Sequence, residues 1–308
     1  MAAAVLLALA GGQAARAQGA GGGCRIERKA RLPLTESHGR FVTTVTVNGR
    51  PLRMLVDTGA QRAALSPAMA DRLRLPRDPG QTFRATGVGG RGREEHPRIA
   101  GSVAFGPATW RRYALQTAAI VRPEQAGDPA APVGLIGADM LSAYDVEFDF
   151  PGRILTLYAV SGCTGRFVPW KGRYDAFPAE PAPADLFVIP VSLEGHRLRA
   201  LLDTGSNTSS LGRAAARTAG VDDARLRGDK ADSYLGSKGA AVAARRHRFG
   251  AFSIGDTLFK NAPIAVRAAD FGVFDMLLGV DFLRSRKVWL SYGTRQVFIQ
   301  SPASTPGR

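Results

Sequence analysis

The first strongly patterned segment of the chain alternates between apolar and polar residues over 41–47. A period of two predicts a β-strand, and the Asn48-Gly49 pair that follows is a preferred two-residue hairpin turn. The alternation resumes over 52–56. It therefore predicts a return strand that ends directly before Asp57.

The same series of elements recurs in the second half of the chain. Residues 186–193 predict a strand, Glu194-Gly195 occupies the turn, and residues 198–202 predict a return strand. This return strand ends directly before Asp203, and both aspartates begin an Asp-Thr-Gly tripeptide. Because the flanking strands repeat together with the tripeptide, one unit has been used twice.

Each half also carries a second shared motif. Residues 134–141 read Gly-Leu-Ile-Gly-Ala-Asp-Met-Leu, and residues 276–283 read Met-Leu-Leu-Gly-Val-Asp-Phe-Leu. We expect one terminal strand after each copy, over 146–158 and 288–300. Asp139 and Asp281 follow the motif glycine, and we expect both to cap a short helix. A repeat of this length indicates two duplicated β-rich lobes and not a solenoid.

Short helices and hairpins are expected after each Asp-Thr-Gly. Ser66 before Pro67 predicts a helix N-terminus, and residues 211–219 predict the equivalent helix. The glycine-containing stretches 81–98 and 232–247 predict one hairpin in each half.

The ends of the chain and its centre lack this patterning. A short apolar run followed by Ala15-Arg16-Ala17 predicts a signal peptide, although a disordered Ala/Gly-rich tail is the alternative. We divide the chain as follows: 1–17 signal peptide, 25–160 N-terminal lobe, 161–185 proline-containing inter-lobe connection, 186–300 C-terminal lobe and 301–308 tail. No segment is apolar for long enough to span a membrane. We therefore expect a periplasmic or secreted protein.

The two cysteines, Cys24 and Cys163, hold roughly equivalent places in the two halves. In an oxidising compartment a disulfide between them would tie together the entry segments of the lobes. Two free thiols are the alternative if the protein is not exported.

The chain is strongly basic, with 41 Lys and Arg against 26 Asp and Glu and a formal net charge of +15. These residues are scattered and accompany no nucleic-acid-binding signature, so we expect no nucleic-acid partner and at most weak attraction to anionic envelope polymers. The four histidines are dispersed, and no pair has metal-ligand spacing. We expect no metal, no cofactor and a monomer.

Two aspartates in duplicated halves could face each other across a pseudo-two-fold axis. Asp57 and Asp203 could not then both ionise easily, because like charges at hydrogen-bonding distance repel each other. They would share one proton, and a water between them could be activated for attack on a carbonyl. This chemistry hydrolyses peptides without a metal or a covalent intermediate.

The neighbouring residues have expected supporting roles. Thr58 and Thr204 can hydrogen-bond across the axis, while Gly59 and Gly205 permit close approach of the backbone. We expect Ser206 to donate its hydroxyl hydrogen to the second aspartate, which would make the two sites unequal.

The doubled Asp-Thr-Gly, each followed by an apolar-apolar-Gly element at 135–137 and 277–279, resembles the aspartic protease superfamily of pepsins and retroviral proteases. The resemblance covers most of residues 41–300. It implies an all-β bilobal fold with two pseudo-two-fold-related lobes, an active-site cleft between them, and Asp57 and Asp203 as the catalytic pair.

Two departures refine the resemblance. The form Asp57-Thr58-Gly59-Ala60 is the retroviral one, and each half is shorter than a pepsin lobe. The first flap candidate, Gly87-Val88-Gly89, lacks the tyrosine that pepsins place over the cleft. The chain is thus most similar in form to bacterial exported two-lobed retropepsin-like proteases, with these three residues as the expected substrate-binding flap.

These observations predict an aspartic endopeptidase that acts on protein or extended peptide substrates. A catalytically silent peptide-binding module of the same fold is the first alternative. A cationic envelope-binding protein is the second, and its attachment to anionic polymers would be salt-sensitive.

Overall fold

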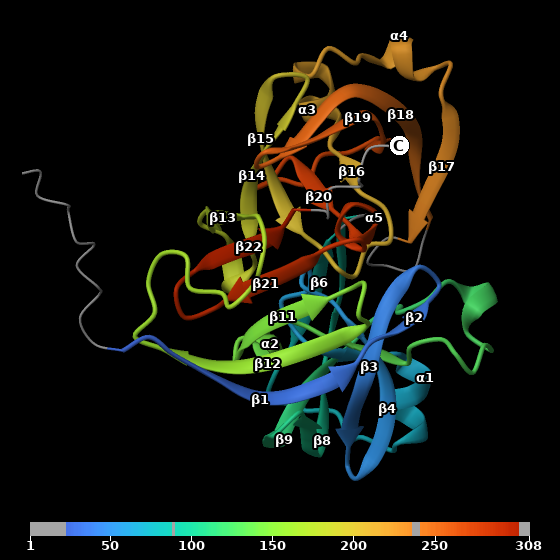
Figure 1. Cartoon of the computed structure of the whole chain (residues 1–308). Helices are drawn as coiled ribbons and strands as arrows, with labels where there is room; N and C mark the ends of the chain where they lie inside the picture. Colours follow the sequence, from blue (N-terminus) through green and yellow to red (C-terminus); the bar gives the residue numbers. More distant parts are fainter. Residues whose placement is uncertain (1–22, 88–89, 236–240, 302–308) are drawn as a thin grey trace, which may run out of the picture.

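The computed structural model describes residues 23–87, 90–235 and 241–301. Figure 1 shows two β-rich lobes, one at each side of a central sheet, with only short helices at their surfaces. Over the described ranges no helix is both long and apolar enough to cross a membrane. The predicted all-β bilobal fold is confirmed.

The N-terminal lobe is built on one sheet of seven strands. In spatial order these strands are β2 (Thr35–Ser37), β3 (Arg40–Val47), β4 (Arg50–Val56), β10 (Gly134–Ile136), β5 (Ala64–Leu65), β9 (Ala108–Thr117) and β8 (Arg98–Phe105). An additional pairing of β3 with β8 closes the sheet on itself. Alternate residues of β3, including Val45 and Val47, are fully buried inside the closed sheet.

The C-terminal lobe repeats six of these strands in the same order, without a counterpart of β2 and with β17 added at the other end. Its order is β14 (Val188–Leu193), β15 (His196–Leu202), β20 (Met276–Leu278), β16 (Ser210–Leu211), β19 (Thr257–Arg267), β18 (Ala241–Ile254) and β17 (Lys230–Leu235), with β14 also pairing with β18. The duplication inferred from the sequence is therefore a duplication of topology.

A third sheet of six strands joins the lobes. Its order is β1 (Arg25–Pro33), β12 (Ile154–Ser161), β11 (Asp145–Asp149), β21 (Lys287–Ser291), β22 (Gln296–Gln300) and β13 (Tyr174–Pro178). The two halves meet where β11 pairs with β21, in the register Val146 to Leu290. Both side chains are buried, so the junction between the lobes is part of the hydrophobic core.

The hairpin turns lie where the sequence predicts them. Asn48 and Gly49 have φ of 50° and 77°, and Glu194 and Gly195 have φ of 48° and 81°. Two successive positive φ values match the twist of the flanking strands, which is why Asn-Gly is favoured here.

The helices are short. They are α1 (Pro67–Arg72), α2 (Ala138–Leu141), α3 (Arg213–Thr218), α4 (Asp223–Leu226), α5 (Val280–Leu283) and the 3₁₀ turns η1 (Pro123–Gln125) and η2 (Pro183–Asp185). The Ser66 hydroxyl accepts a hydrogen bond from the Met69 N–H, as expected of an N-cap. Helix α3 begins two residues later than predicted, because Leu211 belongs to β16.

Three other predicted segments differ in detail or extent. The single terminal strands expected at 146–158 and 288–300 are wrong: each stretch is a hairpin, β11–β12 or β21–β22. The connection 161–185 contains β13, which forms an edge of the central sheet. The first glycine-containing hairpin is β6 (Phe83–Gly87) with β7 (Gly90–Glu95).

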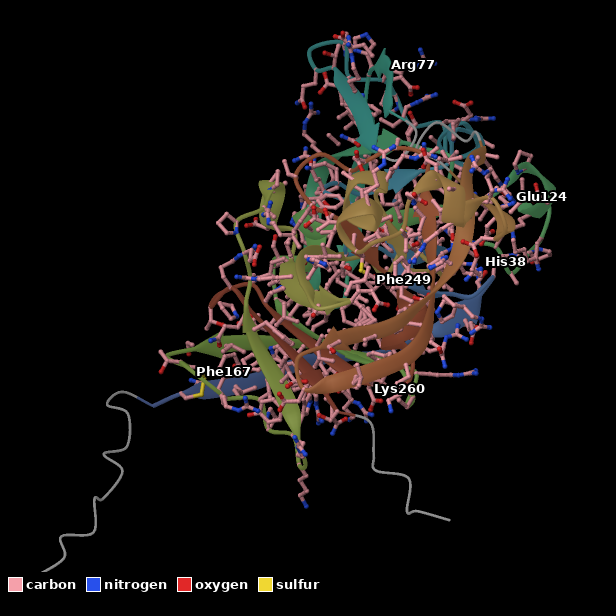
Figure 2. All side chains as sticks on the ribbon, turned by 90° about the horizontal axis from the view of Figure 1, so that it is seen from above. His38, Arg77, Glu124, Phe167, Phe249 and Lys260 are labelled. Atoms are coloured by element: carbon pink, nitrogen blue, oxygen red, sulfur yellow. A yellow bond between two sulfur atoms is a disulfide. The ribbon has the colours of Figure 1, made fainter. Side chains whose placement is uncertain are left out.

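Cys24 and Cys163 form a disulfide, so the bridge predicted from the sequence is present. It lies at the margin of the central sheet, where β1 pairs with β12, and is visible as the yellow bond near Phe167 in Figure 2. The bridge links residues 139 positions apart. It therefore fastens the start of the described chain to the end of the N-terminal half.

We expect replacement of both cysteines by serine to lower the free energy of unfolding by about 2–4 kcal/mol, because a bridge over a long loop restricts the unfolded chain. Urea unfolding with and without reductant measures this. The serine variant, which has no bridge to reduce, should be insensitive to reductant. Equal midpoints for the reduced and oxidised wild-type protein would contradict the prediction.

Candidate active site

Asp57 and Asp203 lie where β4 and β15 end, each held by the second repeated motif. The Asp57 N–H donates to the Ile136 carbonyl, and the Asp203 N–H donates to the Leu278 carbonyl, both at 3.0 Å. Strands β10 and β20 run parallel to β4 and β15 and bring these carbonyls alongside. The apolar-apolar-Gly element thus positions the backbone of each aspartate.

The two Asp-Thr-Gly loops are locked together by their threonines. Each threonine N–H donates to the hydroxyl of the other, Thr58 to Thr204 and Thr204 to Thr58, at 3.1 Å in both directions. The Thr58 hydroxyl donates to the Leu202 carbonyl at 2.7 Å, and the Thr204 hydroxyl donates to the Val56 carbonyl at 2.6 Å. This reciprocal network is buried and matches the predicted contact across the axis.

The carboxyl groups of Asp57 and Asp203 meet at the centre of this arrangement, close enough for the charge of Asp203 to act on Asp57. The Gly59 N–H donates to Asp57 Oδ1 and the Gly205 N–H to Asp203 Oδ1, each at 3.0 Å. A Cβ on Gly59 would lie 2.6 Å from the Asp203 carboxyl carbon, and a Cβ on Gly205 would lie 2.3 Å from that of Asp57. Only glycine fits at these two positions.

Burial raises the pKa of both aspartates above the ordinary range, and the charge of Asp203 raises that of Asp57 further. The groups that lower the pKa differ between Asp57 and Asp203. Arg267 and the Gly205 and Ser206 N–H groups lower the pKa of Asp203, whereas the Gly59 N–H and Arg40 lower that of Asp57. The charge of Asp203 raises the pKa of Asp57, whereas Arg267 lowers that of Asp203, so a shared proton is favoured on Asp57 and the negative charge on Asp203.

Two arginines beside the carboxyls were not singled out from the sequence. Arg40 begins β3 and donates to the Ile120 carbonyl at 3.2 Å, while Arg267 ends β19 and is 4% exposed. Burial lowers the pKa of both guanidinium groups, although the charge of Asp203 acts in the opposite direction. These arginines, more than Ser206, make the surroundings of the two aspartates unequal.

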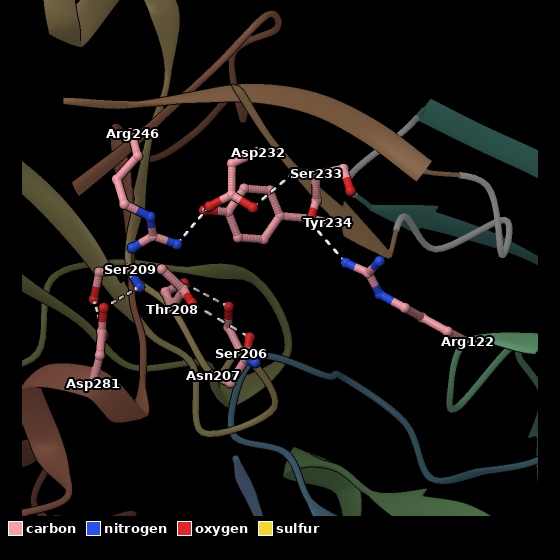
Figure 3. A network of polar contacts seen from close by, with 10 residues as sticks. All are labelled: Arg122, Ser206, Asn207, Thr208, Ser209, Asp232, Ser233, Tyr234, Arg246 and Asp281. Carbon is pink, nitrogen blue, oxygen red and sulfur yellow. Dashed lines mark hydrogen bonds and ion pairs between the residues drawn. The ribbon is translucent and has the colours of Figure 1, made fainter. Parts of the chain in front are cut away.

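The expected hydrogen bond from Ser206 to Asp203 is absent from the site. The Ser206 hydroxyl donates instead to the Thr208 carbonyl at 2.8 Å, within the loop that Figure 3 shows. Its contribution to Asp203 comes from the backbone N–H. The prediction was wrong because a serine at a turn can satisfy its hydroxyl locally.

The prediction that Asp139 and Asp281 cap helices is also wrong. The N-caps of α2 and α5 are the motif glycines, without a side-chain bond. Asp139 accepts from the Ala63 N–H at 2.9 Å and from the Tyr113 hydroxyl at 2.6 Å. Asp281 accepts from the Ser209 N–H at 2.8 Å and the Ser209 hydroxyl at 2.6 Å. Both carboxylates therefore secure the segment that follows an Asp-Thr-Gly.

The predicted flap is described only in part. Gly87 ends β6 and pairs with Gly90, whereas Val88 and Gly89 lie outside the described residues. From the other lobe, Asp232, Ser233 and Tyr234 of β17 line the cleft. The first hairpin lacks the tyrosine that pepsins place over the cleft. In this protein Tyr234, from the hairpin of the C-terminal lobe, lines the cleft.

The cleft over the carboxyls has a volume of about 470 Å³ and draws its lining from both lobes. Arg122 of the N-terminal lobe reaches across it, and its Nη2 donates to the Ser233 carbonyl at 2.8 Å (Figure 3). Within the C-terminal lobe, Arg246 of β18 is paired with Asp232 of β17. The cleft is therefore bounded by polar contacts whose donors are arginines.

Comparisons with known proteins agree with this geometry. Residues 43–143 match the model of the family described as gag-polyprotein putative aspartyl protease, and residues 189–282 match that of the family described as Aspartyl protease. No curated protein matches the chain.

Among solved structures, the aspartic proteinase from Irpex lacteus is similar to this protein with a TM-score of 0.52 and 12% sequence identity. The match covers 90% of this chain and 98% of that one. At this identity the likeness concerns the fold. The family matches fall on both repeated halves, each spanning one Asp-Thr-Gly loop. The chain belongs to the aspartic protease superfamily.

Proposed function

We propose that this protein is an endopeptidase that hydrolyses peptide bonds with a water activated between Asp57 and Asp203. The observation that carries the proposal is the pair of carboxyl groups at one cleft, on two loops that the threonine network joins. Both residues are partly exposed and line the cleft, so a water and a substrate carbonyl can reach them.

The unequal surroundings of the two carboxyls support a different role for each. Asp203, which carries the charge, acts as the general base and removes a proton from the water as its oxygen bonds to the carbonyl carbon. Asp57 donates its proton to the carbonyl oxygen, so no separated charge builds up. Collapse of the tetrahedral intermediate breaks the C–N bond, and the amine leaves with the proton first taken by Asp203. One of the two hydroxyls on the carbon returns its proton to Asp57, which forms the product acid and restores the starting pair.

The framework supports this chemistry by holding the two carboxyls still. The threonine network joins the loops through four hydrogen bonds that involve no solvent-exposed group. Pre-positioning of reacting groups is a large part of enzymatic rate enhancement. An extended peptide would lie along the cleft and present alternate side chains to its two walls.

The experiment is cleavage of a mixed peptide library by the purified protein across pH, with Asp203→Asn as the blank. We expect a bell-shaped profile. The acid limb arises when the pair takes up a second proton, and the alkaline limb when it loses the shared one. Because both pKa values are raised, both limbs should lie above the ordinary aspartate pKa, with the optimum displaced towards neutrality. An optimum below that pKa would contradict this assignment.

Binding of peptides without cleavage at any pH would overturn the proposal. It would assign the cleft to a silent peptide-binding module instead. Cleavage that is equal in the Asp203→Asn blank would point to another protease in the preparation.

We also propose that the protein acts outside the cytoplasm, in the periplasm or after secretion. The Cys24–Cys163 disulfide supports this, since such bridges persist in oxidising compartments. The apolar run at the N-terminus supports it as well. Fractionation of cells expressing the tagged protein tests the location, and recovery in the cytoplasm with free thiols would contradict it.

A further inference from the structure

Arg267 is a buried cation with an unused hydrogen-bonding group. It is 4% exposed, and its Nε donates to the Ser210 hydroxyl at 2.8 Å. Its Nη1 is buried and has no hydrogen-bond partner among the residues that the structure describes. An unpaired donor on a buried charge is costly, because the group has lost water without gaining a replacement.

The other arginines that line the cleft each have a hydrogen-bond or ion-pair partner. Arg246 is paired with Asp232, Arg122 donates to the Ser233 carbonyl, and Arg40 donates to the Ile120 carbonyl. Arg267 differs from them in its burial and in its open donor, and it too lines the cleft. The unused donor is therefore a property of this position and not of cleft arginines in general.

Aromatic rings hold the Arg267 guanidinium in place. Its central carbon lies 4.5 Å from the centre of the Tyr234 ring and 5.2 Å from that of Phe271. Such contacts fix the plane of the guanidinium and stabilise its charge without using its N–H groups. The group is thus rigid and charged, and it retains hydrogen-bonding capacity for a ligand.

The repeated architecture does not require an arginine here. Strand β16 pairs with β19 as Leu211 with Val266, and β5 pairs with β9 as Leu65 with Thr117. The next residue is Arg267 in one lobe and Ala118 in the other, and both line the cleft. Since an alanine occupies the equivalent position in the other lobe, the fold does not need an arginine there. The arginine is therefore a feature of the C-terminal wall of the cleft.

We propose that Arg267 forms a subsite that binds the carboxylate of a glutamate or aspartate side chain next to the scissile bond of the substrate. The proposal rests on the function proposed above. A guanidinium matches a carboxylate in geometry as well as in charge. The subsite is adjacent to the reacting carboxyls because Arg267 and Asp203 line the same cleft, and Arg267 is close enough to lower the pKa of Asp203.

The test uses blocked peptides that are identical except for Glu or Gln at each position flanking the cleaved bond. We expect wild-type protein to favour Glu at one position by about 10- to 100-fold in kcat/KM, the range for a hydrogen bond to a charged group. In Arg267→Gln the preference should fall below about threefold. Arg111→Gln removes the same charge from an exposed position on β9 and should keep the wild-type preference.

A second variant guards against misfolding. Arg267→Met replaces the buried cation by an apolar chain of similar length, so the free protein should be at least as stable as wild type in thermal unfolding. It should also lose the Glu preference. Equal Glu and Gln rates in wild type, or a preference unchanged in both folded variants, would overturn the proposal.

Two further measurements separate the alternatives. If blocked Glu and Gln peptides are cleaved equally by wild type, but a peptide with a free C-terminal carboxylate is cleaved faster than its amidated form and Arg267→Gln removes that difference, the side-chain assignment is wrong. If both Arg267 variants shift the pH profile but keep the Glu preference, Arg267 acts on Asp203 and not on substrate, which also overturns the proposal.

Binding to the Asp57→Asn variant separates this inference from the proposed function. Fluorescence anisotropy with a labelled Glu peptide and its Gln counterpart reports the subsite without turnover. A Glu preference there that Arg267→Gln removes supports the subsite even if wild type cleaves nothing. Cleavage without any Glu preference supports the proposed function and rejects the subsite.

Discussion

Asp57→Asn and Asp203→Asn are each expected to lower kcat/KM by at least about 1,000-fold, because neither variant can both remove a proton from water and donate one to the carbonyl. The amide is nearly isosteric with the acid, so the threonine network and the glycine N–H contacts should persist. Peptide cleavage under conditions of the wild-type optimum measures the loss.

Stability distinguishes a catalytic role from a structural one. A carboxyl whose folded pKa is raised opposes folding at a pH above its unfolded pKa, and this cost disappears as the pH falls through the unfolded value. A neutral amide removes the cost, so both variants should unfold at the wild-type temperature or higher at neutral pH. Asp256→Asn, at a carboxyl that is 79% exposed, is the matched control and should keep full activity.

Activity within tenfold of wild type in either variant would place the chemistry elsewhere. A fall in unfolding temperature that parallels the loss of activity would mean that the aspartates mainly support the fold. Either result would remove the basis of the proposed mechanism.

Gly205→Ala should reduce kcat/KM by about 100-fold or more, since displacement of a reacting group by an ångström has an effect of this size. The added Cβ would lie 2.3 Å from the Asp57 carboxyl carbon, so one of the two loops has to move. Because the loops are joined by the threonine network, the movement separates the carboxyls.

Gly228→Ala is the control for this substitution. A Cβ at Gly228 meets nothing within 4 Å, and the residue is exposed, so activity should not change. Circular dichroism and thermal unfolding would establish that Gly205→Ala still folds. Full activity in a folded Gly205→Ala protein would show that the close approach of the loops is not needed for the reaction.

Much of the fold could be predicted because the same sequence pattern occurs in both halves of the chain. The hairpin before Asp57 and the one before Asp203 share alternation, turn position and the Asp-Thr-Gly that follows. One such segment is weak evidence, but two copies at the same spacing constrain the strands, the lobes and the meeting of the carboxyls together. The same reasoning correctly paired Thr58 with Thr204.

Features present in only one lobe could not be predicted this way. Arg267 stands among many arginines in a basic chain, and nothing local marks it as buried. Its signal is a break in the repeat, an arginine opposite Ala118, and this becomes visible only when β9 and β19 are aligned by their pairings. The roles of Asp139 and Asp281 were missed for a related reason, since the backbone N–H groups that they accept from, those of Ala63 and Ser209, lie over 70 positions away in the chain.

The order of the strands along the chain determines the order in which the parts of the candidate site can fold during synthesis. All seven strands of the N-terminal sheet precede residue 137, so that lobe can close early during synthesis. Strand β13, in contrast, can pair only after β22 has been made, because Tyr174 pairs with Gln300. The partner of Asp57 is supplied by the second lobe, which is made after the first. A growing chain that has not yet reached residue 203 therefore holds half of the candidate site, and the pair of carboxyls assembles only when the second lobe has been made.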